Sequence, residues 1–294
     1  MNAHTTPAKA WKDHAFVLAW PTVLLMVGIL IGEAVLWWVA LAGHMSPWIA
    51  WAPATVLGYL AFTVMHEAGH GNIHGRHAMY KPLSEACGWL SGFVLAAPFP
   101  AFRVLHNLHH SHTNNPEKDP DHWVVGPNAF SVALRCLTIY FYYYQDFIIG
   151  VSSKTRPAKK ERNKVLVTTA VFAAIAVGLS AAGMGVWVIS LWIVPAILSC
   201  GLLAFVFDWI PHHPHSVQKR MHDTRVLLFP GLNLVTLGQS YHLIHHLWPR
   251  VPFYRYQACF RDSRPFLEAN GAPIEGVETG QDLLGFGDSP VMHM

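Results

Sequence analysis

Charged residues are scarce in this sequence. Asp, Glu, Lys and Arg make up 13% of its 294 residues, whereas a soluble domain usually carries about 25%. Hydrophobic residues make up 52%, with 12 Trp and 16 Phe. This composition excludes most soluble globular proteins and indicates a protein of the lipid bilayer. The length fits a single domain over residues 1–294.

Cysteine is scarce as well. The four cysteines lie far apart and form no C-x-x-C pair, which argues against a zinc ribbon and against a disulfide framework. The net charge is only +3, so no nucleic-acid partner is expected. A cleavable signal pattern is also missing, because the first apolar run is too long for one, and we interpret that run as a permanent span.

Lys and Arg are missing from two long stretches, and four apolar runs fill them. A membrane helix needs about 20 mostly apolar residues. The runs cover residues 16–42, 48–65, 165–182 and 186–210. Because very short turns join them in pairs, we expect an all-α integral membrane protein whose four transmembrane helices form two hairpins.

The positions of Lys and Arg also predict the orientation. None lies between Lys12 and Arg76, and none between Lys164 and Lys219. The positive-inside rule therefore places the N-terminal tail and the segments 66–164 and 211–294 in the cytoplasm. We expect these segments to form a helical cap, with helices over 88–102 and 129–151 at the membrane interface.

A basic run, residues 154–164, directly precedes the third apolar run. It contains six Lys and Arg residues and one Glu. Our first interpretation is a topology determinant that faces anionic lipid. A docking patch for an acidic electron carrier is the second.

Histidine is unusually abundant. The sequence has 20 histidines, as many as Lys and Arg together, and most lie in the two predicted cytoplasmic segments. Three clusters have the spacing H-x-x-x-H or H-x-x-H-H, and one more histidine follows the fourth run. These nine candidate ligands are His66, His70, His106, His109, His110, His212, His242, His245 and His246.

The spacing of the clusters predicts a metal site. Residues three or four apart share one face of a helix, so each cluster presents two or three imidazoles to one point. Nine ligands are too many for one ion, since zinc takes four. Two ions with about four or five ligands each would use them, and imidazole suits Zn, Cu, Fe and Ni. Ligation by histidine alone fits an oxidant better than a hydrolytic site.

Other polar residues near the clusters are candidates for supporting roles. Glu67, Asp119, Asp121 and Asp208 would orient imidazole N–H groups or water. His74 lies one helical turn beyond His70 and is a candidate for either a ligand or such a role.

Two alternatives of other classes remain. His66-Glu67-Ala68-Gly69-His70 matches H-E-x-x-H, which is typical of zinc proteases with the Glu as general base. A haem-binding electron carrier would need only one or two axial ligands. Both leave most of the histidines without a role.

The three histidine clusters together resemble those of the membrane fatty-acid desaturase and hydroxylase superfamily. The resemblance covers roughly residues 60–250. A narrower similarity, to desaturase-like bacterial carotenoid β-ring hydroxylases, rests on residues 114–123, 207–212 and 232–254, and continues at 264–273. Glu67 and Gly69 stand where that branch would have Asp and Ser.

The resemblance implies two non-haem iron ions bound by the nine histidines, O2 as oxidant, and ferredoxin or a similar electron donor. We expect the protein to lie in a bacterial inner membrane, and the positions of Lys and Arg predict that the active site is on the cytoplasmic side. We therefore expect an O2-dependent di-iron membrane oxygenase that acts on an unactivated C–H bond of a lipid-like substrate. Hydroxylation of a carotenoid β-ring is our first assignment, and fatty-acyl desaturation, hydroxylation or oxidative decarboxylation is the second.

Overall fold

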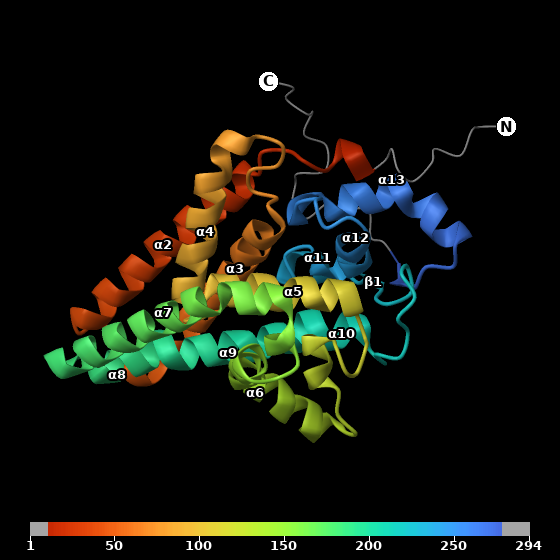
Figure 1. Ribbon diagram of the computed structural model, residues 1–294. Coiled ribbons are helices and arrows are strands. Elements are labelled where there is room, and N and C mark those ends of the chain that lie inside the picture. Colours follow the sequence, from red (N-terminus) through yellow and green to blue (C-terminus); the bar gives the residue numbers. More distant parts are fainter. Residues whose placement is uncertain (1–10, 278–294) are drawn as a thin grey trace.

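Two long apolar helices open the fold (Figure 1). The computed structural model describes residues 11–277. After a short 3-10 turn at Trp11–Asp13, the chain forms α2 (Trp20–Leu41) and α3 (Pro47–His70), which pack against each other. Both helices are long and apolar enough to cross a membrane, and they correspond to the first two predicted runs.

Local sequence explains where α3 begins and ends. The Ser46 hydroxyl accepts a hydrogen bond from the backbone N–H of Trp48, which satisfies one of the free donors at the helix start. Gly71 ends the helix in the left-handed conformation, with φ of 71°. The helix is therefore longer than the predicted apolar run, and it carries His66 and His70 in its last turns.

A bent pair of helices follows. After a 3-10 turn at Ala78–Tyr80, α4 (Lys81–Val94) and α5 (Phe99–His112) are bent by 99° at the break between them. The prediction of one interfacial helix over residues 88–102 is wrong. Pro98 disfavours helical geometry in the residue before it, so the chain breaks there and starts α5 anew.

A tyrosine-rich helix connects the two halves of the fold. A 3-10 turn at Pro120–Val124 leads into α6 (Ala129–Ile148), and another at Ser152–Lys154 leaves it. The Asn128 side chain caps α6 by accepting a hydrogen bond from the Ser131 N–H. The helix predicted over residues 129–151 is confirmed.

A continuous helical run from Arg156 to His212 contains the next two predicted apolar runs. Its four α-helical pieces are α7 (Arg156–Leu179), α8 (Gly185–Val188), α9 (Val194–Leu203) and α10 (Ile210–His212). Three π-helical turns join them, at Ser180–Met184, Ile189–Ile193 and Ala204–Trp209. Gly183 has a φ of 87° and kinks the run, so that Val188 and Trp192 pack against the apolar side of α7.

The number of spans depends on how these helices are counted. By length and composition, three helical segments of the described residues could cross a membrane, or four if the bent pair of α4 and α5 forms one span. The 57-residue run is one of the three although it is kinked at Gly183. The four spans in two hairpins stay a prediction.

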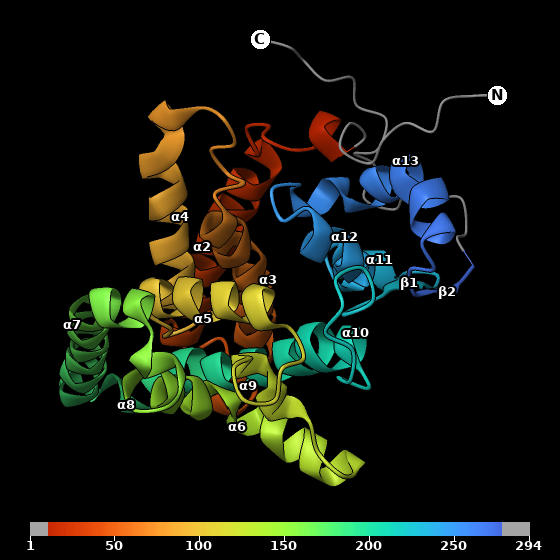
Figure 2. The same ribbon diagram turned by 45° about the vertical axis from the view of Figure 1, so that its right-hand side comes forward.

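The C-terminal part of the described chain forms a small cap beside the long helices (Figure 2). Its elements are β1 (Val226–Leu228), α11 (Leu232–Val235), 3-10 turns at Gln239–Tyr241 and Phe253–Arg255, α12 (His242–Leu247), α13 (Tyr256–Ala269) and β2 (Ile274–Gly276). The two strands pair in parallel, so the all-α prediction is wrong in this detail. Buried side chains of α12 and α13, among them Leu243 and Phe260, pack against Ala15 and Ala19 from the start of the described chain.

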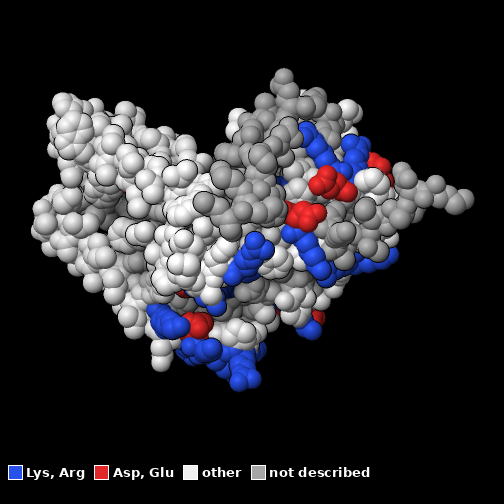
Figure 3. Space-filling model, turned by 90° about the horizontal axis from the view of Figure 1, so that it is seen from above, with Lys and Arg blue, Asp and Glu red and all other residues white. Residues whose placement is uncertain are grey.

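Charge is distributed very unevenly over the surface. Figure 3 shows Lys and Arg on one half of the visible face, whereas the other half has no charged side chain in view. Large apolar side chains are exposed on the long helices; Leu24 of α2, for example, is 67% exposed and Val177 of α7 is 68% exposed. Since a water-soluble surface does not expose so many apolar groups, these helices form a lipid-facing belt.

Candidate metal centre

Imidazoles from four separate segments meet beside the cap. They come from the end of α3, from α5, from α10 and from α12. Two groups of four have ligand nitrogens within 4.8 Å of one another: His66, His70, His106 and His245 form the first group, and His109, His212, His242 and His246 form the second. The sequence prediction that remote clusters converge is confirmed, and eight of its nine histidines belong to these two groups.

In both groups the Nε2 atoms point toward one another. In the first group, Nε2 of His66 lies 3.0 Å from Nε2 of His245. In the second group, Nε2 of His242 lies 3.0 Å from that of His212 and 3.1 Å from that of His246. Nitrogens at right angles around one ion, each bound at about 2.1 Å, would be about 3 Å apart. These spacings fit ligands of a shared ion.

The ninth histidine, His110, lies between the two groups. It shares a third set of nearby ligand atoms with His245 of the first group and His246 of the second. Its Nε2 also lies 3.1 Å from that of His106. His110 is therefore placed where it could serve either group.

The outer nitrogens of several imidazoles have fixed partners. Nδ1 of His109 lies 2.9 Å from Asp119 and 3.2 Å from Asp121. Nδ1 of His212 lies 3.0 Å from the Asp223 backbone oxygen, and Nδ1 of His242 lies 2.8 Å from the Gln239 side-chain oxygen. Because these partners accept hydrogen bonds, each Nδ1 carries the proton and each Nε2 presents a lone pair to the centre.

The hydrogen bonds at the outer nitrogens indicate that these residues fit a metal. If Nδ1 carries the proton in both His212 and His242, two bare lone pairs face each other across 3.0 Å. No hydrogen bond relieves that contact, whereas a cation between the nitrogens would. Burial lowers the pKa of His242, His245 and His246 well below the usual value, which keeps these imidazoles neutral and able to bind an ion. The donor set therefore fits two metal ions, each with four nitrogen donors.

The predicted acids lie around the imidazoles, in different roles. Asp119 and Asp121 contact His109, as predicted. Glu67 is fully buried and accepts a hydrogen bond from Asn72, and it lies 3.9 Å from Nδ1 of His66.

Asp208 contacts no imidazole at hydrogen-bond distance among the described residues. It lies 3.4 Å from the Tyr143 hydroxyl, which donates to Asp121 at 2.7 Å. Burial raises the pKa of Asp121 to about 6, while the neighbouring His109 opposes this shift.

His74 belongs to none of the groups of possible ligands. It lies in the turn after α3, and its Nδ1 is buried without a partner among the described residues. The sequence suggested that it extends the ligand face of α3, but α3 ends at His70, so the helical spacing does not continue to His74.

Sequence reasoning missed several groups that touch the site. Gln239, Tyr256, Tyr143 and the Asp223 carbonyl were not predicted. Gln239 lies three residues before His242, so helical spacing could have indicated it. Tyr256 comes from a separate helix, α13, and nothing in the sequence marks it.

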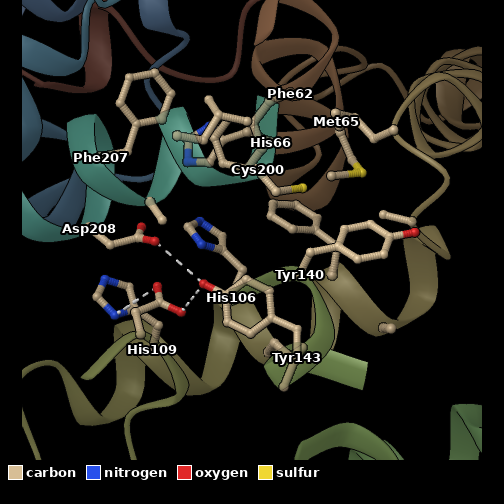
Figure 4. A pocket seen from close by; sticks show the side chains of 18 of the residues that line it. Phe62, Met65, His66, His106, His109, Tyr140, Tyr143, Cys200, Phe207 and Asp208 are labelled. Atoms are coloured by element: carbon tan, nitrogen blue, oxygen red, sulfur yellow. Dashed lines mark hydrogen bonds and ion pairs between the residues drawn. The ribbon is translucent and has the colours of Figure 1, made fainter. Parts of the chain in front are cut away.

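A largely apolar pocket of about 1000 Å³ of empty space, part of it open to solvent, reaches the centre. Figure 4 shows His109, Asp208 and Tyr143 at one end, and Tyr140 and Met65 toward the other. The remaining lining is mostly apolar and comes from α3, α5, α6 and α9, from the end of α4 and from the π-helical turn after α9; it includes Phe62, Leu95, Phe102, Leu105, Phe147, Leu203 and Phe207. The pocket suits an apolar molecule that presents one segment to the imidazoles.

Comparisons with known proteins identify a family whose match covers this site. The sequence matches the fatty acid desaturase family over residues 46–277, which include all nine histidines. It is 24% identical to an omega-3 fatty acid desaturase, chloroplastic, from Brassica napus, over 77% of this chain and 64% of that protein.

Two further relatives have related names. An sn-2 acyl-lipid omega-3 desaturase (ferredoxin), chloroplastic, from Helianthus annuus is 22% identical over 87% of this chain and 62% of its own length. An sn-1 oleoyl-lipid 12-desaturase from Synechocystis is 29% identical over 65% of this chain and 56% of its own length. The chain thus spans less than two thirds of the length of these relatives. Their names favour the fatty-acyl assignment over the carotenoid assignment that the sequence ranked first.

Proposed function

Because the chain belongs to the fatty acid desaturase family, we propose that it is a non-haem di-iron membrane oxidoreductase that uses O2 to desaturate a lipid-bound or free fatty acyl chain. One observation carries this proposal. Two groups of four imidazoles meet at the end of an apolar pocket, so an oxidising centre would face an alkyl chain.

The two groups provide the ligands. His66, His70, His106 and His245 would hold one iron, and His109, His212, His242 and His246 the other, with His110 between them. When bound, the irons supply the activation of O2 that removes hydrogen from an unactivated C–H bond. Overall, two C–H bonds of neighbouring carbons become a double bond. O2, two electrons and two further protons complete the balance, giving two molecules of water.

The protein's own residues position the reactants. Phe62 contacts Phe102 edge-on and Phe207 at a tilt, and the three rings form an apolar wall next to His66 and His106. An alkyl chain held there would be fixed in place and shielded from water, which lowers the barrier by orientation. Tyr143 holds Asp121, and Asp121 in turn contacts His109, so the polar end of the pocket is tied to the imidazoles.

We also place the protein in the membrane as one domain. Two hairpins, α2–α3 and α7–α9, would span a bacterial inner membrane, and the imidazoles and cap would lie at its cytoplasmic side. The absence of Lys and Arg from residues 13–75 and 165–218 supports this orientation. The electrons would come from ferredoxin or a similar carrier, since one relative carries ferredoxin in its name.

Product analysis tests the substrate. The full chain is expressed in a bacterium that also makes β-carotene, and both acyl chains and pigments are analysed. We expect new double bonds in the acyl chains and unchanged pigment. Hydroxylated β-rings with unchanged acyl chains would contradict the acyl assignment and favour the carotenoid one.

A further inference from the structure

A second hollow lies on the side of α5 that faces away from the imidazoles. It holds about 1100 Å³ of empty space between α5 and the start of α7. We call it the basic groove, and its polar lining consists of Arg103, Asn107, Ser111, Arg156, Lys160 and Glu161. At 100° per residue, Asn107 and Ser111 lie on the face of α5 opposite His109, and Arg103 lies at the edge of that face.

The groove carries positive charge that its own acids do not neutralise. Glu161 pairs with Lys164 at 2.7 Å, and Arg103 pairs with Glu85 at 2.6 Å. Arg156 and Lys160 are exposed, and no carboxylate of the described residues pairs with either. A partner with surface carboxylates would complement them.

The groove is close to the imidazoles but separate from the substrate pocket. An α-helix is about 10–12 Å across with its side chains, so only the width of α5 separates the groove from the metal ligands. Buried Val104, Leu105, Phe147 and Val165 form a core cluster between the two hollows. A partner in the groove would approach the centre closely without blocking the acyl chain, and electron transfer becomes faster as distance falls.

The position of the groove along α7 favours a protein partner over lipid. The exposed apolar surface of α7 includes Leu166 and Val167, about 9 Å along the helix from Lys160. The groove therefore lies beyond the lipid-facing belt, and exposed Asn107 and Ser111 extend it further in that direction.

We infer that the basic groove docks the acidic protein that delivers electrons to the centre. The inference rests on the proposed function. Two electrons enter per turnover, so a one-electron carrier would dock twice. Each docking oxidises the carrier by one electron and reduces the centre by one, and it makes or breaks no covalent bond.

A charge-reversal experiment tests the groove. Wild type, Arg156→Glu/Lys160→Glu and the control Lys118→Glu/Lys219→Glu are placed in phosphatidylcholine nanodiscs as full chains. The control makes the same charge change at exposed residues outside the groove. The probe is a reduced, acidic [2Fe–2S] ferredoxin. We measure its Kd for each protein and its KM in acyl oxidation. We expect the groove variant to raise Kd and KM at least about tenfold, and the control less than about threefold.

Single-turnover reduction with dithionite separates docking from damage to the centre. It should be equal in all three proteins, because dithionite needs no docking surface. Unchanged ferredoxin binding in the groove variant would overturn the inference, whatever its activity. A lipid effect would also overturn the inference. In that case added phosphatidylglycerol would raise the turnover of wild type but not of the groove variant, while both proteins still bound ferredoxin, because lipid would then occupy the groove. If wild type binds ferredoxin at the groove but dithionite yields no oxidised acyl product, the proposed function fails and the docking surface stands.

Discussion

The Tyr256 hydroxyl oxygen lies 3.1 Å from Nδ1 of His245. The other nitrogen of this imidazole, Nε2, lies 3.0 Å from Nε2 of His66. Tyr256 is fully buried and comes from α13, whereas His245 belongs to α12. The cap therefore does more than cover the centre, because it also orients one of the imidazoles.

Removing this hydroxyl should weaken metal binding. In Tyr256→Phe, Nδ1 of His245 loses its hydrogen-bond acceptor, so the imidazole is free to rotate or to change tautomer. Loss of such a partner typically costs about 10–100-fold in metal affinity or activity. Iron content after dialysis against a graded chelator series measures the affinity. Tyr241→Phe is the matched control, since Tyr241 is buried in the same core cluster. Equal iron retention in both variants would show that Tyr256 only fills space.

A pair of histidine variants on α5 should separate ligands from bystanders. His109 belongs to the second group, whereas His112 bonds the Leu108 carbonyl through Nδ1 and belongs to neither group of four. We expect His109→Ala to lose acyl oxidation and about one iron per chain, and His112→Ala to keep both. Membrane levels of both variants are measured by immunoblot. Full activity of His109→Ala would refute its role as a ligand.

Filling the pocket should stop turnover without removing the metal. Ala204 is 2% exposed and lines the pocket, so a phenyl group there would occupy the space of the acyl chain. We expect Ala204→Phe to keep its iron, to lose at least about 1 kcal/mol of stability through overpacking, and to lose most acyl oxidation. Ala170→Phe on the exposed side of α7 is the control. Similar turnover in both variants would mean that the substrate does not enter this pocket.

The sequence predicted the histidine clusters and the long apolar helices because both depend on regular spacing. His66 and His70 share a face of α3 by helix geometry alone, and an apolar run marks a membrane helix regardless of its neighbours. The convergence of α3, α5, α10 and α12 could be expected because the clusters lay on one predicted side of the membrane.

The remaining features depend on contacts between distant segments. Tyr256 reaches His245 only because α13 packs on α12, and the parallel pairing of β1 with β2 joins residues about fifty apart. The bend between α4 and α5 was missed because the apolar run continues through the break, and hydropathy does not detect a change of direction. His74 belongs to none of the groups of possible ligands because the helix on which its spacing depended ends at His70, and its supporting role stays a prediction.

Metal analysis of the purified full chain tests the central claim most directly. Elemental analysis together with an absorption spectrum gives the identity and number of bound ions. We predict about two irons per chain and no haem absorption, with both irons lost when imidazoles of both groups are replaced. A single zinc per chain, or one haem, would contradict the account.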